Sequence, residues 1–120
     1  MRSSDGYRLL ARKEGERVSL WTRHGTKVTE RLPRIAAVVR NLLAESALID
    51  GSAVVFRPDG RSDIAALRTK AGGAQAWFVA FDLLNLDRED LRQRRIEERR
   101  DKLSKLVAGS GRSGTLGEFT

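Results

Sequence analysis

The sequence predicts an α+β domain in which a mostly antiparallel sheet carries flanking helices. Three observations support this fold class. The chain opens with two alternating segments joined by a short turn, its middle combines a helix-spaced apolar pattern with a β-rich run, and a strongly apolar stretch later precedes a charged helical segment. With 120 residues, 40% of them hydrophobic, the chain has room for a single domain with one modest core.

The first part of the sequence, up to about residue 44, predicts a hairpin followed by a helix. The alternating segments 7–13 and 17–21 flank Glu14-Gly15-Glu16, which is typical of an antiparallel hairpin. A turn over 22–26 follows, and Pro33 suits the first position of a helix. The helical spacing extends to about Ala44, and the residues that carry it are Leu32, Ile35, Val38, Val39, Leu42 and Leu43.

The middle of the chain predicts a strand and a short helix. The β-rich run 47–56 ends in the turn sequence RPDGR. Ser62 can cap a short helix over 63–70, which the pair Gly72-Gly73 then ends.

The last part of the sequence, from residue 75 onward, predicts a buried strand, a charged helix and a tail. The stretch 75–86 is the most apolar and favours a central strand covered on both faces. A helix over 94–107 exposes its segment 97–101 and buries a thin stripe of Ile96, Leu103, Leu106 and Val107. We expect 109–120, rich in glycine and serine, to form a flexible tail.

The composition limits which binding partners and which cellular compartment we expect for this protein. The 23 Lys and Arg against 16 Asp and Glu give a net charge of +7, which favours polyanions such as nucleic acid or nucleotide phosphates. Without cysteine, neither disulfides nor thiolate metal sites can form. Because no signal-peptide core and no membrane-length apolar run occurs, we expect a cytoplasmic protein with no membrane association.

Four short motifs stand in a fixed order along the chain. They are Asp5-Gly6-Tyr7-Arg8, Thr22-Arg23-His24-Gly25, Asp50-Gly51-Ser52 and Phe78-Val79-Ala80-Phe81-Asp82-Leu83-Leu84. Taken singly, the Asp-Gly pairs fit hairpin turns, Arg23 fits a solvated turn, and Phe81 fits ordinary core packing. The single histidine, His24, fits the turn better than catalysis or metal binding, because no partner stands at a ligand spacing.

In this order the motifs resemble the adenylation domain of ATP-dependent DNA ligases, particularly those of bacterial end-joining systems. That family has a KxDGxR motif, an arginine-glycine turn, a DGE strand and an FDxL strand. The resemblance covers nearly all of 4–108 and implies that 1–108 form a partial, ATP-grasp-like nucleotidyltransferase core. It implies ATP and magnesium as cofactors and DNA as the partner. It assigns Arg8 and Arg23 to the nucleotide and DNA side and Phe81 to stacking on adenine; the other motif positions are Asp5, Gly6, Gly25, Asp50, Gly51 and Asp82.

Two positions depart from the family pattern. Ser3 stands where KxDGxR has its nucleophilic lysine, and Ser52 stands where DGE has its glutamate. Lysine attacks the α-phosphate through its deprotonated amine, and a serine hydroxyl with no neighbouring base is far less nucleophilic. We therefore expect no catalytic residue, no self-adenylylation by the chain alone, and ATP and magnesium binding that is weak or absent.

The family pattern continues into EG and KxK strands and an OB-fold domain, which we expect this chain to lack. Two other interpretations remain: a small basic nucleic-acid or nucleotide-binding module without catalysis, and one half of a split ligase. We expect sequence-independent DNA binding with a Kd of roughly 10⁻⁴ to 10⁻⁶ M. Because the strands 47–56 and 75–86 would lack cover, we also expect a homodimer or a partner polypeptide that contacts them.

Overall fold

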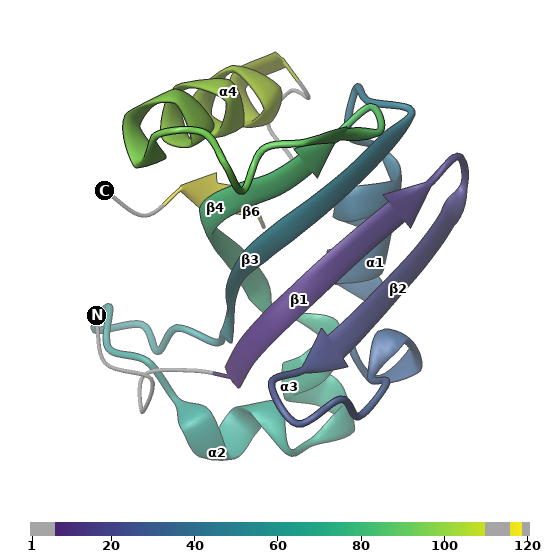
Figure 1. Cartoon of the computed structure of the whole chain (residues 1–120). Coiled ribbons are helices and arrows are strands. Elements are labelled where there is room, and N and C mark those ends of the chain that lie inside the picture. The colour runs from purple at the N-terminus through teal and green to yellow at the C-terminus, as the bar shows by residue number, and fades with distance from the viewer. Residues whose placement is uncertain (1–6, 110–115, 119–120) are drawn as a thin grey trace.

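A curved β-sheet organises the computed structural model, which describes residues 7–109 and 116–118. Its strands are β1 (Tyr7–Glu14), β2 (Arg17–Thr22), β3 (Ser46–Val54), β4 (Trp77–Leu86), β5 (Glu89–Asp90) and β6 (Leu116–Glu118). The helices are the 3₁₀ helix η2 (Thr29–Arg31), α1 (Pro33–Arg40), α2 (Ile64–Leu67), α3 (Lys70–Ala74) and α4 (Ile96–Gly109). Neighbours in the order β2-β1-β3-β4-β5 are antiparallel, and β6 pairs with β4 in parallel. The predicted fold class is confirmed (Figure 1).

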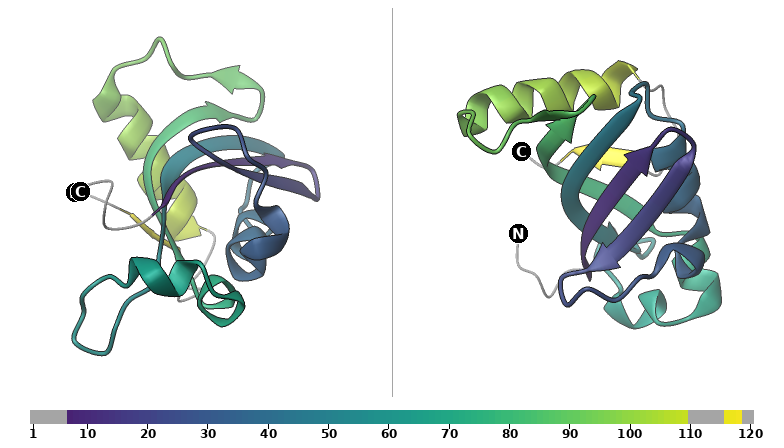
Figure 2. Two further views of the ribbon diagram at one scale, coloured as in Figure 1. Left: turned by 90° about the horizontal axis from the view of Figure 1, so that it is seen from below. Right: turned by 45° about the vertical axis from the view of Figure 1, so that its right-hand side comes forward.

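Helix α1 covers one face of β1 and β2 and leaves the opposite face open. Figure 1 views this open face, and Figure 2 shows α1 on the concave side of the sheet. Alternation along β1 decides which side chains point to each face of the sheet. Leu9 and Ala11 are buried in the core with Ile35 of α1. Arg8 and Arg12, on the opposite face, are exposed. The open face of the sheet is therefore the one on which polar motif residues can meet a ligand.

A buried lysine joins the first hairpin to the end of α1. The Lys13 side chain is 6% exposed, and its Nζ donates to the carbonyl oxygens of Gly15 at 2.7 Å and Arg40 at 2.8 Å. The ammonium therefore satisfies a carbonyl at the C-terminus of the helix, where positive charge is favourable. The predicted helix was too long: α1 ends at Arg40 rather than near Ala44, and Leu43 beyond it is 73% exposed.

The segment between β3 and β4 differs from its prediction in two ways. Asp63, not Ser62, is the N-cap, because its carboxylate accepts from the backbone N–H of Ala66 at 3.1 Å. Gly72 and Gly73 do not end a helix but lie inside α3.

The reason for both glycines is close packing. A Cβ on Gly72 would stand 1.8 Å from the carbonyl oxygen of Ala66, and one on Gly73 would stand 2.4 Å from that of Arg31. Only glycine lets α3 approach α2 and η2 this closely.

The apolar stretch forms β4 as predicted, with two irregularities. Its register against β3 shifts twice, which leaves Phe81 and Leu84 as extra residues, or β-bulges, of β4. Asp82 and Leu83 between the bulges pair with Asp50 and Ile49 of β3.

The edges of β3 and β4 change one expectation about partners. β3 pairs with β1 on one side and β4 on the other, so it has no free edge to offer a second chain. The outer edge of β4 pairs with β5 near Leu86 and with β6 at Phe78 to Ala80. Oligomeric state itself stays a prediction.

The C-terminal part of the described chain also departs from expectation. Helix α4 runs over Ile96–Gly109, slightly later than predicted, and buries Leu103 and Leu106 while Ile96 stays 38% exposed. Within the expected flexible tail, Leu116–Glu118 instead form β6 beside β4. The tail positions 110–115 and 119–120 lie outside the described residues.

Candidate functional site

Three motif residues from three strands meet on the sheet. Arg8 of β1 donates to Asp50 of β3 through one edge of its guanidinium, with Nε to Oδ1 at 3.0 Å and Nη2 to Oδ2 at 2.7 Å. The same guanidinium lies 5.7 Å from the ring centroid of Phe81 in β4. The hydrogen bond from Arg8 to Asp50, assisted by their charge attraction, raises the pKa of Arg8 above its ordinary value. The arginine is thus a fixed cation at this site.

The turn after β2 brings a second arginine beside the first. The backbone N–H of Gly25 donates to the carbonyl of Thr22 at 2.9 Å, and Gly25 has a φ of +86°, which favours glycine. Arg23 is exposed in this turn, next to His24. The turn therefore explains why the motif contains glycine where it does.

Arg8 and Arg23 together line two adjoining hollows. One has a volume of about 280 Å³ and includes Asp50, and the other has about 460 Å³ and includes His24 and Arg31. We call these two spaces the motif hollow. Its lining residues are Tyr7, Arg8, Leu9, Leu10, Thr22, Arg23, His24, Thr26, Val28, Arg31 and Asp50.

The other two residues of the third motif are buried in the sheet. A Cβ on Gly51 would stand 2.5 Å from the carbonyl oxygen of Val79 and 2.6 Å from Cε1 of Phe78, so glycine is needed for β3 and β4 to pack. Ser52 is 3% exposed and offers almost no surface to a ligand. Gly51 is therefore explained by packing.

Asp82 has a structural partner that the sequence interpretation missed. Arg99 of α4 donates to it through Nε at 2.9 Å and Nη2 at 3.1 Å, and the two side chains are 16% and 18% exposed. The hydrogen bond to Asp82 raises the pKa of Arg99 above its ordinary value. The expected solvated segment 97–101 is therefore wrong at Arg99, which ties α4 to β4. No local spacing signals a pair that lies 17 residues apart.

Asp50 and Asp82 lie directly opposite each other on β3 and β4. Like charges in this arrangement repel, but each carboxylate here is held by its own arginine. Within residues 7–109 and 116–118, no group of three or more acidic or histidine side chains could hold a metal ion. The remaining predicted site residues, Ser3, Asp5 and Gly6, lie outside the described residues.

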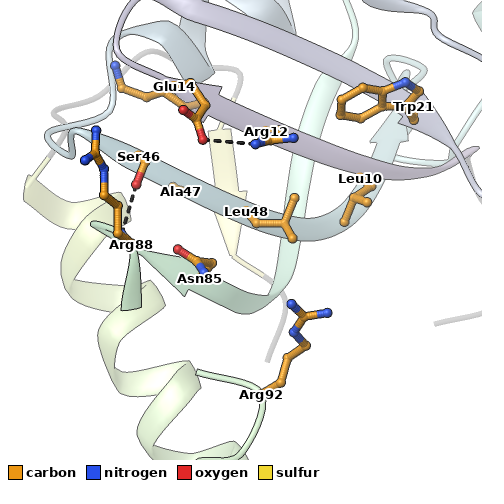
Figure 3. Close-up of a pocket in the computed structure, with 11 residues that line it drawn as sticks. Leu10, Arg12, Glu14, Trp21, Ser46, Ala47, Leu48, Asn85, Arg88 and Arg92 are labelled. Atoms are coloured by element: carbon orange, nitrogen blue, oxygen red, sulfur yellow. Dashed lines mark hydrogen bonds and ion pairs between the residues drawn. The ribbon is translucent and has the colours of Figure 1, made fainter. Parts of the chain in front are cut away.

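A second hollow of about 520 Å³ lies on the open face of the sheet and contains none of the predicted site residues (Figure 3). Leu10, Trp21 and Leu48 give it apolar surface. Its basic residues include Arg12, which pairs with Glu14 at 3.0 Å, and Arg92, which pairs with Asp90 at 3.1 Å. We call it the tryptophan hollow; its other lining residues are Lys13, Ser46, Ala47, Asn85 and Arg88. Strand alternation, which places Leu10, Arg12 and Glu14 on one face, was the signal that could have found it.

The described helices are all too short or too polar to cross a membrane.

Comparison with solved structures supports the same fold. The ligase domain of Mycobacterium tuberculosis LigD aligns with 97% of this chain and 38% of its own, at 32% identity and a TM-score of 0.82. A mycobacterial DNA ligase D complexed with ATP and MES aligns with 97% of this chain and 37% of its own, at 32% identity and a TM-score of 0.79.

Curated relatives are similar in sequence over most of this chain. The multifunctional non-homologous end joining protein LigD of Pseudomonas aeruginosa is 40% identical over 88% of this chain and 13% of its own length. DNA ligase C of Mycobacterium tuberculosis is 32% identical over 93% of this chain and 34% of its own length. The chain thus spans about a third or less of these relatives. Residues 3–116 match the model of the ATP dependent DNA ligase domain, and the chain belongs to that family.

Proposed function

We propose that this chain is the nucleotide-binding part of a ligase adenylation domain and that it holds ATP at the motif hollow. The observation that carries the proposal is the position of Arg8, which is bound to Asp50, lies over Phe81 and shares its hollow with Arg23. Guanidinium groups match phosphate oxygens in a bidentate geometry, and an aromatic face suits a purine. The family relationship adds ATP as the nucleotide.

The existing contacts of Arg8 support weak binding. A triphosphate must compete with the Asp50 carboxylate for the guanidinium, and a base that stacks on the covered side of Phe81 must displace it. Ser52 adds no charged acceptor for the ribose hydroxyls. The described residues contain no cluster of three acidic or histidine side chains, so a magnesium ion would have to take most of its ligands from the triphosphate and from water.

Titration with ATP, followed by two-dimensional amide NMR, tests this proposal. We expect shifts at Arg8, Arg23 and Phe81, with saturation at millimolar rather than micromolar ATP. Phe81→Ala and Arg23→Ala should each weaken binding at least threefold, whereas Arg100→Ala on the exposed surface of α4 is the matched control and should leave it unchanged. ATP shifts that spare the motif hollow, or equal affinity in all variants, would overturn the proposal.

The same proposal includes an absence of covalent chemistry in the isolated chain, because Ser3 replaces the lysine nucleophile. Incubation with labelled ATP and magnesium, followed by denaturing mass analysis, should give no mass increment of AMP. The Ser3→Lys variant should not seal nicked DNA. An adduct on the unmodified chain that survives denaturation would contradict this part.

A second candidate function is nucleic-acid binding without catalysis. The net charge of +7 and the exposed arginines of the motif hollow favour it. It predicts DNA affinity that falls steeply with added salt and is independent of ATP. A split ligase, in which another polypeptide supplies a lysine at the position of Ser3, remains our third hypothesis.

A further inference from the structure

Two arginine–aspartate pairs stand side by side on the sheet. One joins Arg8 of β1 to Asp50 of β3 and belongs to the motif hollow. The other joins Asp82 of β4 to Arg99 of α4, and among the described residues that line the motif hollow neither of these two occurs. Asp50 and Asp82 are register partners, so the two pairs meet at their acidic ends. We call these four side chains the charge row.

The acidic ends of the two pairs lie close enough to compete for a cation. Residues directly opposite each other in neighbouring antiparallel strands have Cβ atoms about 4.5 to 5.5 Å apart. An Asp82 carboxylate without its own cation would therefore repel Asp50 and attract Arg8. Arg8 lies over Phe81, which directly precedes Asp82 in the chain, so its guanidinium would have only a short way to move. The observed position of Arg8 thus depends on the neutralisation of Asp82.

Arg99 is held firmly on Asp82. Its guanidinium donates to both carboxylate oxygens and, through Nη1, to the carbonyl oxygen of Arg94 at 2.7 Å. The Arg99 side chain is 16% exposed, whereas that of Arg8 is 47% exposed. The helix that carries Arg99 is anchored in the core by the buried Leu103. Arg99 is therefore the fixed cation of the charge row, and Arg8 is the one that a ligand can reach and move.

We propose that Arg99 is a positioning residue for the nucleotide site and that it acts by neutralising Asp82. With Asp82 neutralised, Arg8 remains on Asp50 and over Phe81, and an approaching triphosphate meets one unpaired negative charge fewer. Helix α4 thereby takes part in nucleotide binding through a side chain outside the motif hollow. The inference rests on the proposed function only in assigning ATP to that hollow, because the effect of Arg99 on Arg8 needs no ligand.

Three variants separate the charge of Arg99 from its hydrogen bonds. Arg99→Gln removes the charge but leaves an amide donor, Arg99→Lys keeps the charge, and Arg99→Gln combined with Asp82→Asn removes both charges of the pair. Arg100→Gln, at the exposed neighbouring position of α4, removes the same charge and is the matched control. Two-dimensional NMR of the arginine Nε–H groups, recorded without ATP, reports whether Arg8 stays hydrogen-bonded to Asp50.

The charge of Asp82 decides the expected results. We expect the Nε–H signal of Arg8 to shift or broaden in Arg99→Gln and to return in the double variant, where no unpaired charge remains. Arg99→Lys and Arg100→Gln should leave this signal in place. Affinity for ATP should follow the same pattern, with a loss of roughly three- to tenfold in Arg99→Gln and less than about twofold in the other variants.

The outcomes separate the position of Arg8 from the binding of ATP. An unchanged Arg8 signal in Arg99→Gln would overturn the inference. A change that persists in the double variant would overturn it as well, because Arg99 would then support α4 rather than neutralise Asp82. A changed signal without ATP binding at the motif hollow would overturn the nucleotide site alone.

The amide spectrum of each variant confirms that the folded chain is compared. If Arg99→Gln does not fold, Arg99→Lys and the double variant carry the test. Retention of the Arg8 signal in both supports the inference, and its loss in either one overturns it.

Discussion

Two hollows of similar size differ in how their arginines are paired. The tryptophan hollow has a volume of about 520 Å³, and a hollow beside α3, which we call the α3 hollow, has about 460 Å³. In the tryptophan hollow, Arg12 and Arg92 each pair with an acid two residues away, Glu14 and Asp90. The cations that line the α3 hollow form no ion pair with another described residue; they are Arg31, Arg68 and Lys70. The comparison teaches that a net charge of +7 does not tell which cations are paired, because pairing depends on the acidic residues that lie nearby.

The largest expected effect comes from a side chain at Gly73, where α3 packs against η2 beside the α3 hollow. Gly73→Val places a side chain against the carbonyl of Arg31, where even a Cβ would lie 2.4 Å away, so α3 must move. We expect a loss of about 1 to 3 kcal/mol in the free energy of unfolding, measured by urea denaturation. Gly109→Ala, where a Cβ meets nothing within 4 Å, is the control and should change stability by less than about 0.5 kcal/mol. A Gly73→Val protein as stable as the unchanged chain would contradict the packing argument.

The next effect compares a largely buried ion pair with an exposed one. Arg99→Ala removes the bidentate donor of Asp82, whose side chain is only 18% exposed in the intact pair, and we expect this variant to show the larger loss in the free energy of unfolding. Arg12→Ala removes a partner of Glu14 from a pair in which both side chains are more than half exposed, and we expect about 0.2 to 1 kcal/mol. Urea denaturation of both variants gives the two values. Similar losses would show that burial does not distinguish the pairs.

A third experiment converts one hollow toward the other. Glu14→Gln combined with Asp90→Asn releases Arg12 and Arg92, so the tryptophan hollow gains two unpaired cations. Duplex affinity at low salt should rise by on the order of threefold. Glu45→Gln combined with Glu97→Gln changes the net charge equally at exposed positions away from both hollows. If this control variant gains as much affinity, then total charge rather than pairing decides.

The smallest effect is a pH dependence in the tryptophan hollow. The backbone N–H of Arg92 donates to Asp90, and with the Arg92 side chain it lowers the pKa of this exposed carboxyl. The unfolded chain then binds a proton more readily, so the stabilisation is present above pH of about 4 and is lost as pH falls through the lowered pKa. Carboxyl carbon NMR should show Asp90 titrating below an ordinary aspartate. A normal titration would mean that the pair does not persist in solution.

The sequence predicted those parts of the molecule that local pattern controls. Strand alternation predicted the hairpin of β1 and β2, and the order of the four motifs predicted the family. The roles of Gly72 and Gly73 were not predictable, because a glycine pair that breaks a helix and one that packs inside it look alike in sequence. The family pattern assigned Arg8 and Phe81 to the nucleotide and gave Asp50 only as a motif position, so the contacts among these three residues were not predicted.

Long-range partners explain what remained hidden. Arg99 was placed on the solvated face of its helix because its neighbours are charged, and its partner Asp82 lies on another element. The α3 hollow brings Arg31 and Lys70 together from segments that only tertiary packing places side by side. Unpaired charge is a property of three-dimensional surroundings, so composition alone could not assign it.

The two bulges of β4 set the parity of the strand. Each extra residue inverts the alternation of all side chains beyond it, and the second inversion restores the first. Phe81 thereby allows Ala80 and Leu83, three positions apart, to point into the same core, and Leu84 does the same for Leu83 and Leu86. Deletion of Phe81 alone would remove the first bulge and leave Asp82 opposite Asp50 and Leu83 opposite Ile49, so the core side chains would keep their face. We therefore expect the two bulges to be the places in β4 where homologous chains can differ in length by a single residue.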